Sequence, residues 1–342
     1  MSVADAVTNT IQSCPSNLAH EFTDFQLRTS SSREPWAVVL AGGDGVRLRS
    51  LSRLISGDDR PKQFCALTGG ETLLDQTRGR LSGMIADRQT LFLLTQTHER
   101  FYADQLAGVA EERLLIQPYN HGTAPAISYS LTHIDQLDPG AIVAFFPSDH
   151  HFANDEAFAA HMNRAFTQAE LDPEHVILLG IQADAPEESY GWIEPGNRVA
   201  GGAVSEVRRF WEKPSRRVAA QLMRDGCLWN SFVMVGRASA FLAMIRRTLP
   251  ELLRSLESME GRGLHELYAG IPATNFSDEV LSKRPSDLTV LPARGLGWSD
   301  LGEPQRVLSA LSIHSLGWNV PIESMMPGLE VPAPSEMEAP KR

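Results

Sequence analysis

The sequence of 342 residues lacks the features that mark several common classes of protein. Its three cysteines, Cys14, Cys65 and Cys227, lie far apart with no CxxC spacing, which argues against a zinc site and against a disulfide framework. No apolar run approaches the ~20 residues needed to span a bilayer, and the N-terminus lacks the basic start and apolar core of a secretory signal. We therefore expect a cytoplasmic protein with no membrane partner.

Positive charge is also scarce, and this bears on the choice of partner. The chain carries 31 lysines and arginines against 42 aspartates and glutamates, a formal net charge of −11. No basic block compensates for this balance, so a nucleic-acid partner is not expected. An anionic small molecule stays compatible, because it needs only a local positive pocket.

A glycine-rich stretch, L-A-G-G-D-G-V-R-L from Leu40, lacks the two best-known phosphate-binding signatures. A Rossmann fingerprint beginning at Gly43 would need a third glycine where Leu48 stands, and an acidic residue at the end of the next strand. A Walker loop would end in G-K-[ST], and this stretch does not. The glycines must therefore be interpreted from their own surroundings.

These surroundings indicate a nucleoside triphosphate. The apolar run that ends at Ala41 predicts a buried strand, and the glycines after it form a turn where bare backbone can approach a polyanion. Arg47 and the lysine of R-P-K-Q-F, Lys62, add two cations, which argue against the alternative of a turn kept only for packing. We assign the nucleotide to Leu40, Ala41, Gly42, Gly43 and Gly45, with Arg47 and Lys62 as catalytic cations.

From Trp36 onward, short apolar runs alternate with segments of helical character. The runs are nearly continuous, as in strands that are covered on both faces. This alternation predicts an α/β fold with a doubly wound, mostly parallel sheet. We expect strands over 37–40, 91–95, 114–117, 141–146 and 175–180, and helices over 72–86, 98–108, 124–137, 155–170, 215–225 and 238–258.

We expect three segments along the chain. Residues 1–34 are polar and are interpreted as a loosely ordered extension, and residues 313–342, rich in Pro, Met and Glu, as a tail. Between them lies one domain, 35–312, with a nucleotide half over 35–180. The second half, 181–312, contains sheet-like runs joined by turns, which we interpret as an inserted substrate-binding β-subdomain.

Two aspartates are candidate magnesium ligands. Asp149, in F-F-P-S-D-H-H, follows a predicted buried strand, and the carboxyl ends of parallel strands open onto the ligand crevice. The alternative role for this aspartate is a helix N-cap. A second carboxylate, Asp300 in G-W-S-D-L-G, favours a shared Mg²⁺ site on the α-phosphate. His150 and His151 are expected to pack or hydrogen-bond beside it, because imidazole suits Mg²⁺ poorly.

Two further groups of residues suit a sugar and a nucleobase. Lys213, in F-W-E-K-P, could pair with a sugar phosphate, or be an exposed surface lysine. Glu194, in Y-G-W-I-E-P, and Asn230, in W-N-S, could bind sugar hydroxyls. The run Q-P-Y-N-H-G-T-A-P-A-I either starts a capped helix or reads a base, and the residues alone do not choose that base. We assign nucleotide binding here to Gln117, Asn120, Gly122, Thr123 and Ala124.

On these motifs the chain resembles the bacterial mannose-1-phosphate guanylyltransferases (GDP-mannose pyrophosphorylases) of the sugar-phosphate nucleotidyltransferase family. The resemblance spans about residues 36–311, and the motifs quoted above occur in the family's order. L-A-G-G-x-G-x-R-L and F-P-S-D-H resemble patterns of sugar nucleotidyltransferases in general. P-K-Q-F and G-T-A-P-A-I favour the guanylyl branch.

The resemblance implies a Rossmann-like, GT-A-like fold and one reaction. The oxygen of mannose-1-phosphate would attack the α-phosphorus of GTP in line and release pyrophosphate, with Mg²⁺ held by Asp149 and Asp300. The glycines would wrap the nucleotide, with Arg47 and Lys62 on the triphosphate. The resemblance assigns sugar binding to Gly191, Glu194 and Asn230, with Lys213 on the sugar phosphate.

Three departures from the family pattern leave specificity open. Asp44 and Val46 stand where the family has small hydroxyl residues, and His121 where an arginine is frequent. Another nucleotide or another hexose-1-phosphate is the first alternative, and a non-catalytic nucleotide-sugar-binding regulator is the second. A homodimer through the Met- and Leu-rich helices after residue 238 is an option, although core packing is the favoured use of those residues.

Overall fold

The computed structural model describes residues 34–199, 201–258 and 263–314, with side chains up to residue 310. The expected N-terminal extension lies outside the described residues except for Glu34, and so does the expected tail from residue 315 on. No helix in the described part of the chain is long and apolar enough to cross a bilayer.

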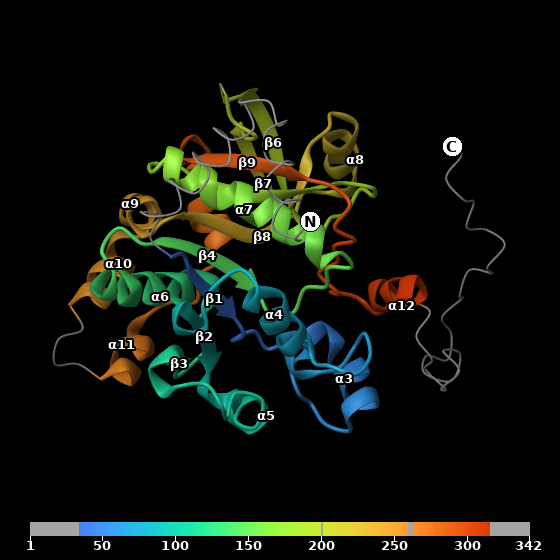
Figure 1. Ribbon diagram of the computed structural model, residues 1–342, viewed down its shortest axis with the longest axis vertical. Coiled ribbons are helices and arrows are strands. Elements are labelled where there is room, and N and C mark those ends of the chain that lie inside the picture. Colours follow the sequence, from blue (N-terminus) through green and yellow to red (C-terminus); the bar gives the residue numbers. More distant parts are fainter. Residues whose placement is uncertain (1–33, 200, 259–262, 315–342) are drawn as a thin grey trace, which may run out of the picture. The chain divides into compact units, whose positions relative to one another are not determined.

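Within the described residues, nine strands form one sheet in the order β3-β2-β1-β4-β8-β5-β9-β7-β6 (Figure 1). The five predicted strands are confirmed as β1 to β5, within two residues at each end. The strands are β1 (Trp36–Leu40), β2 (Thr90–Thr95), β3 (Leu114–Gln117), β4 (Ile142–Pro147), β5 (Val176–Gln182), β6 (Gly191–Arg198), β7 (Ser205–Glu212), β8 (Leu228–Arg237) and β9 (Leu288–Ala293).

Parallel pairing brings the segments that carry the candidate residues to one edge of the sheet. β1 pairs in parallel with β2 and β4, and β2 with β3. In this register Leu40 lies beside both Leu93 and Pro147. The glycine-rich stretch after β1 and the aspartate after β4 therefore leave the sheet at the same edge.

The strands of the second half extend the same sheet. β8 lies antiparallel between β4 and β5, and β5 pairs in parallel with β9. The β6–β7 hairpin joins through β9 and β8, so β7 and β8 run against the other strands. The expected substrate-binding β-subdomain is thus continuous with the nucleotide half in one mixed, mostly parallel α/β sheet.

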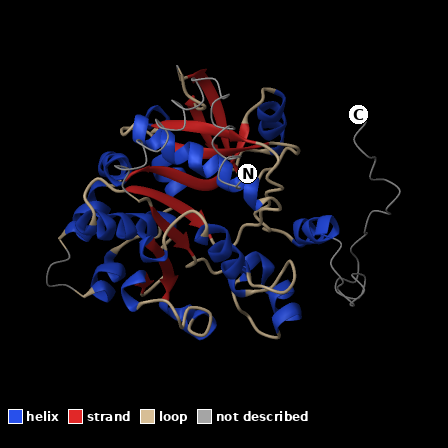
Figure 2. Ribbon diagram, viewed as in Figure 1, coloured by secondary structure: helices blue, strands red, loops and turns tan. Residues whose placement is uncertain are grey.

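Helices cover both faces of this sheet (Figure 2). Because side chains alternate along a strand, Val38 and Phe145 enter one apolar core, whereas Val39 and Phe146 enter the other. The first core is covered by α6 (Thr123–Leu137), α9 (Ala238–Thr248), α10 (Pro250–Glu257) and α11 (Leu264–Gly270), and the second by α4 (Leu73–Ser82), α7 (Asp155–Leu171) and α8 (Arg216–Arg224).

A third, smaller core packs the C-terminal helix of the described chain against the nucleotide half. Leu51 of α3 (Arg49–Ser56) and Val307 of α12 (Pro304–His314) both belong to it, together with Leu301. Short helices complete the fold: η2 (Val46–Leu48), η3 (Lys62–Phe64), η4 (Asp87–Gln89), η5 (Gln96–His98), η6 (Glu111–Arg113), η7 (Ser277–Leu281) and η8 (Pro285–Asp287).

Two helix predictions need correction. The stretch over 98–108 is α-helical only in α5 (Glu99–Tyr102), because Asp104 and Gly108 disfavour its continuation. The stretch over 238–258 is two helices, since Pro250 has no amide hydrogen with which to continue α9. Buried residues of these helices, such as Met244, pack into the first core, which supports core packing as their use.

Candidate active site

A cavity of about 330 Å³, called the first cavity below, lies at the carboxyl ends of β1 and β4. Asp149 and Phe232 line it, as do Gln63 and His150. Of the ten residues assigned to the nucleotide, Ala41, Gly45 and Ala124 are not part of this lining. The other seven line it: Leu40, Gly42, Gly43, Gln117, Asn120, Gly122 and Thr123.

The P-K-Q-F motif holds the glycine-rich loop in place. Gly45 has φ 57°, and a Cβ there would lie 2.9 Å from the backbone nitrogen of Lys62, so glycine is required. The side-chain amide of Gln63 donates hydrogen bonds to the carbonyls of Ala41, at 3.0 Å, and Gly43, at 2.8 Å. Gln63 was not assigned from the sequence, although its place beside Lys62 was the available signal.

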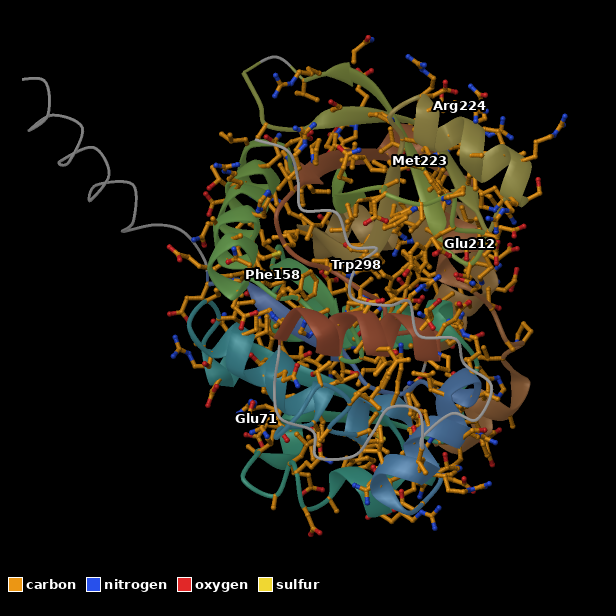
Figure 3. All side chains as sticks on the ribbon, turned by 90° about the vertical axis from the view of Figure 1, so that its right-hand side faces the viewer. Glu71, Phe158, Glu212, Met223, Arg224 and Trp298 are labelled. Atoms are coloured by element: carbon orange, nitrogen blue, oxygen red, sulfur yellow. The ribbon has the colours of Figure 1, made fainter. Side chains whose placement is uncertain are left out.

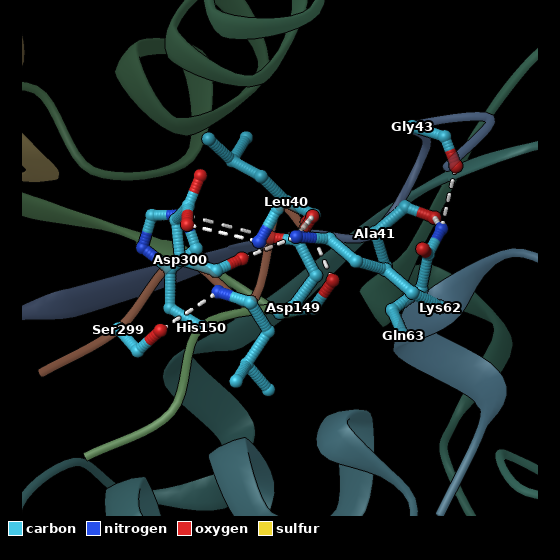
Figure 4. Close-up of polar contacts among 12 residues, drawn as sticks. Leu40, Ala41, Gly43, Lys62, Gln63, Asp149, His150, Ser299 and Asp300 are labelled. Carbon is cyan, nitrogen blue, oxygen red and sulfur yellow. Dashed lines mark hydrogen bonds and ion pairs between the residues drawn. The ribbon is translucent and has the colours of Figure 1, made fainter. Parts of the chain in front are cut away.

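Lys62 joins the two predicted magnesium ligands (Figure 4). Only 7% of this lysine is exposed, and its Nζ donates a hydrogen bond to the backbone carbonyl of Asp300. The same Nζ lies 3.2 Å from Oδ2 of Asp149. Arg47, by contrast, is exposed on η2 and does not line the first cavity. The structure therefore brings three of the four predicted catalytic residues together.

A short backbone bridge explains why the two aspartate motifs meet. The amide of His151 donates to the carbonyl of Ser299 at 2.9 Å, and the amide of Ser299 returns a bond of 3.0 Å. The neighbouring His150 accepts a hydrogen bond at Nδ1 from the indole of Trp298, at 3.3 Å. Burial lowers the pKa of His150, although the charge of Asp149 opposes this. The imidazole thus packs beside the site, as the sequence predicted.

The two aspartates have different surroundings. The side chain of Asp149 is 30% exposed and lines the first cavity, whereas Asp300 is only 8% exposed. Oδ1 of Asp300 accepts hydrogen bonds from the hydroxyl of Tyr190, at 2.8 Å, and from Arg306, at 2.6 Å. Burial opposes ionisation of Asp300, but positive charge from His150 when protonated, from Arg306 and from Lys62 outweighs burial and lowers the pKa.

Arg306 is a residue of this site that sequence reasoning missed. Its guanidinium contacts Asp300, donates to Ser189 Oγ at 3.2 Å, and pairs with the carboxylate of Glu187. It also lies 4.4 Å from the centre of the Tyr190 ring. No helix was predicted after Asp300, and the available signal was Pro304, a residue type that favours the first turn of a helix, two positions before this arginine.

A second loop that lines the first cavity, around Gly122, is fixed by the segment before η7. Gly122 has φ 86°, and a Cβ there would lie 2.5 Å from the carbonyl oxygen of Thr274. The hydroxyl of Thr123 accepts a hydrogen bond from the amide of Phe276 at 2.8 Å. The amide of Ala124 donates to the carbonyl of Thr274 at 3.0 Å, so the start of α6 is held in place beside the first cavity.

Asp44, which departs from the family pattern, connects the two loops. Its Oδ2 accepts a hydrogen bond of 2.9 Å from the side-chain amide of Asn120, and its Oδ1 lies 3.1 Å from Nε2 of His98. Burial lowers the pKa of His98, and the charge of Asp44 opposes that shift. The carboxylate thus already has two polar partners within the protein. His121, the other notable departure, hydrogen-bonds through Nδ1 to the carbonyl of Ile271.

Three of the four predicted sugar-side residues lie together, around a fourth that was not predicted. A Cβ on Gly191 would lie 3.3 Å from Cβ of Asn230 and 3.0 Å from Oε2 of Glu212. Oε1 of Glu212 pairs with Nζ of Lys213 at 3.1 Å. Burial raises the pKa of Glu212, and Lys213 works against this rise. Glu212 is labelled in Figure 3, and its position in F-W-E-K-P was the available signal.

Glu194, the fourth predicted sugar-side residue, does not join this group. Side chains alternate along a strand, so Ile193 enters the first core, whereas Trp192 enters the second. The side chain of Glu194 therefore lies on the same face of the sheet as Trp192, and Gly191 lies on the other face. Its carboxylate accepts hydrogen bonds from Arg208, at 3.2 Å, and from the indole of Trp211, at 3.4 Å.

The sugar-side group and the first cavity lie on the same face of the sheet. Phe232, which lines the first cavity, packs against the first core. Asn230 precedes it by two residues in β8, and its Oδ1 accepts a hydrogen bond from the amide of Phe232 at 3.1 Å. The sugar-side group, Gly191, Glu212 and Asn230, therefore lies on the same side of β8 as the first cavity.

The chain is similar to known proteins along most of its length. A family model described as nucleotidyl transferase matches residues 36–314. The mannose-1-phosphate guanylyltransferase ManC of Salmonella typhimurium is 33% identical over 305 residues, which are 83% of this chain and 61% of that protein. The mannose-1-phosphate guanylyltransferase of Escherichia coli K12 is 31% identical, with the same two coverages. The chain thus spans about three fifths of the length of these relatives.

A solved structure has the same fold. It is the crystal structure of a protein named mannose-1-phosphate geranyltransferase, from Thermus thermophilus. It superposes with a TM-score of 0.73 at 30% sequence identity, covering 81% of this chain and 80% of that one.

Proposed function

The chain belongs to the nucleotidyl transferase family, and on that premise we propose that it condenses mannose-1-phosphate with GTP to give GDP-mannose and pyrophosphate. The observation that carries the proposal is that Lys62 contacts both Asp300 and Asp149, and that Asp149 lines the first cavity. Relatives named mannose-1-phosphate guanylyltransferase support the choice of substrates.

The first cavity offers the nucleotide exposed backbone, and the buried ammonium of Lys62 contacts Asp149 in its lining. A Cβ on Gly43 would meet nothing within 4 Å, so open space lies beside this part of the loop. We place the triphosphate against Gly42 and Gly43, with the ammonium of Lys62 neutralising charge as the α-phosphate is attacked. The base then lies toward Asn120 and Thr123, where backbone and amide groups can read its edge.

The donor set fits a divalent cation such as Mg²⁺. Asp149 lines the first cavity, and all three hydrogen bonds to the carboxylate of Asp300 are to its Oδ1, which leaves Oδ2 for a ligand. No group of three or more His, Cys, Asp or Glu side chains among the described residues could hold a metal alone. This suits Mg²⁺, which binds through one or two carboxylates plus phosphate oxygens and water. When bound, it would neutralise charge on the phosphates.

The sugar-side group supplies the second substrate's contacts. We assign hydroxyl recognition to Glu212 and Asn230, with Gly191 leaving room for the ring, and the sugar phosphate to Lys213. Glu212 replaces Glu194 in this role because it faces the same side as Asn230. The phosphate oxygen of the sugar attacks in line, and positioning and charge neutralisation lower the barrier without a covalent enzyme intermediate.

A change of base or sugar is the second candidate, and Asp44 favours it. A carboxylate held between Asn120 and His98 at the base side of the first cavity alters the hydrogen-bonding pattern that a nucleobase would meet. The chemistry would stay the same, and only the preferred nucleotide or hexose-1-phosphate would differ.

Pyrophosphate release from the purified full-length chain tests the proposal. GTP, UTP, dTTP and ATP are each combined with mannose-1-phosphate or glucose-1-phosphate in the presence of Mg²⁺. We expect release chiefly with GTP and mannose-1-phosphate, and its loss in Asp149→Asn. If another pair of substrates gives the fastest release, the proposed specificity is wrong and the proposed chemistry stands. No release from any pair would overturn the proposed function.

A further inference from the structure

A second cavity of about 640 Å³ lies on the opposite face of the sheet from the first cavity. Its walls are strands β6 and β7, with Glu194 and Trp211, and helix α8, with Arg217 and Leu222. Leu222 and Trp211 pack against the second core, not the first. The second cavity is therefore separate from the site described above, although it has about twice the volume of the first.

The lining of the second cavity carries an excess of positive charge. Arg208, Arg217 and Arg224 face two carboxylates, Glu194 and Asp225, in a chain whose formal net charge is −11. Arg208 pairs with Glu194 at 3.2 Å, and no ion pair to a described residue is formed by Arg217. Guanidinium groups bind phosphate in a fixed, bidentate geometry. This charge balance favours a phosphorylated ligand.

The rest of the lining suits the body of a sugar. The guanidinium of Arg209, which is outside the lining, covers one face of the Trp211 ring at 3.6 Å from its centre. The rest of the indole and the side chain of Val218 give an apolar wall, on which the C–H face of a sugar ring can pack. The side-chain oxygens of Glu194 and Gln221 already accept bonds from lining residues, and each has a second lone pair that can accept from a hydroxyl group. A volume of this size accommodates a small polar ligand with room for water.

We propose that the second cavity binds a phosphorylated hexose, with the phosphate at its arginines and the ring on Trp211. The same strands carry the sugar-side group on their other face. Trp211 adjoins Glu212 in β7, and Glu194 follows Gly191 in β6. A ligand that fixes this hairpin changes the affinity of the sugar-side group, and the reverse also holds. The binding claim stands alone, whereas this coupling rests on the proposed function.

Calorimetric titration of the full-length chain with glucose-6-phosphate tests the binding claim. We expect saturable binding that weakens by about tenfold or more in Arg217→Gln, because one guanidinium is lost. The matched control is Arg216→Gln, which makes the same change on the same helix at a residue outside the lining, and it should bind as the wild type does. Binding next to Trp211 should also change the tryptophan fluorescence of the wild type, and this change should be lost in Trp211→Phe. Inorganic phosphate, titrated in parallel, should bind more weakly than the sugar phosphate.

Two further variants locate the ligand. Val218→Trp, which fills the second cavity, should abolish binding, and Asn230→Ala, in the sugar-side group, should retain it. Absence of saturable binding, equal affinity in Arg216→Gln and Arg217→Gln, or loss of binding in Asn230→Ala would each overturn the proposal.

The coupling is measured with the pyrophosphate assay. Glucose-6-phosphate should shift the KM for mannose-1-phosphate in the wild type and in Arg216→Gln, and the shift should be lost in Arg217→Gln. If the wild type releases no pyrophosphate with any substrate pair, the proposed function fails while the titration still decides the binding claim. If activity is present and the KM does not move, the coupling fails alone.

Discussion

Arg306 holds three segments of the candidate active site with one guanidinium, which is mostly buried. It binds Asp300 after β9, Glu187 and Ser189 before β6, and it comes from α12. The planar guanidinium thus orients the carboxylate of Asp300, which we assign to the metal. We regard Arg306 as a positioning residue, because it acts on the reaction through Asp300.

Substituting Arg306 should therefore impair both stability and turnover. Removing one partner of a buried ion pair costs about 3 kcal/mol, and we expect Arg306→Met to lose about that much in urea unfolding. Its kcat should fall by about a hundredfold, with little change in the KM for GTP, since about 2.7 kcal/mol of transition-state stabilisation corresponds to that factor. Arg306→Lys keeps the charge and should recover part of the kcat.

Arg246 offers the control for this substitution. It is exposed and pairs with Glu257 at 2.7 Å, between α9 and α10, where an exposed pair contributes at most about 1 kcal/mol. Arg246→Met should leave turnover unchanged. Equal behaviour of the Arg306 and Arg246 variants would show that Arg306 has no positioning role.

The burial of Glu212 predicts how the stability of the protein depends on pH. Its folded pKa is raised by burial, so the native state disfavours the charged form, and stability falls as pH rises from the unfolded carboxyl pKa through the folded one. Glu212→Gln should remove this loss and be more stable than the wild type at neutral pH. It should also raise the KM for mannose-1-phosphate by about 10- to 100-fold, the effect of losing a charged hydrogen bond.

Urea unfolding across the acidic and neutral range, combined with kinetics, checks both parts. The stability difference between Glu212→Gln and wild type should be small at low pH and grow as the wild-type carboxyl ionises. A variant that is more stable yet still binds the sugar normally would remove Glu212 from the site. A constant difference at every pH would contradict the linkage.

The sequence predicted most of these residues because local motifs carry them. Lys62, Asp149 and Asp300 each lie in a short pattern whose chemistry is legible without the fold. Arg306 and Glu212 could not be assigned in the same way. The role of Glu212 depends on the face of the sheet to which its side chain points, and the role of Arg306 depends on the packing of α12 against the site. Neither feature is encoded in nearby residues.

At the scale of the element, the glycine-rich loop depends on backbone geometry at one position. Gly45 has φ 57° and a neighbouring backbone nitrogen 2.9 Å from where a Cβ would lie. Gly45→Ala should therefore cost about 1–3 kcal/mol. Gly43→Ala is the matched control, because a Cβ there meets nothing within 4 Å, and it should change stability by less than about 0.5 kcal/mol.

Thermal unfolding and GTP titration separate stability from ligand access in these two variants. Gly45→Ala should be destabilised, whereas Gly43→Ala should stay stable and bind GTP less tightly, because its methyl group occupies space next to the proposed triphosphate. If both alanine variants are as stable as the wild type, the loop does not depend on the left-handed backbone at Gly45.

The elements themselves were predictable to different degrees. The strands β1 to β5 are nearly continuous apolar runs, which the sequence shows directly. For β1, β2, β4 and β5 the run is expected because helices cover both faces of the sheet there, whereas β3 lies at the edge of the sheet with Ile116 exposed. The face on which Glu194 lies was not predictable, because β6 alternates around Trp192 and the pairing of the hairpin decides which side meets the substrate. The break at Pro250 was visible in the sequence, yet the apolar pattern on both sides of it suggested one helix.

At the scale of the whole domain, the expected halves are not separate folding units. Both apolar cores contain residues from each half: Val38 and Ile193 share the first core, and Val39 and Trp192 share the second. The sheet is also continuous across the boundary near residue 180, through β8. The substrate-binding strands therefore cannot unfold without exposing the core of the nucleotide half.

This continuity predicts one cooperative unfolding transition for residues 35–314, observable by calorimetry. Two additions are compared, GTP with Mg²⁺ in one experiment and mannose-1-phosphate in the other. Each should raise the temperature of that same transition, because each ligand binds only the folded state. At about 100 times its dissociation constant, either ligand adds ~2.7 kcal/mol. The contrary result is two unfolding transitions, with GTP raising the temperature of only one. That result would mean that the two halves unfold independently despite the shared sheet. In that case the second-cavity ligand could order the β6–β7 hairpin without reaching the nucleotide half at all.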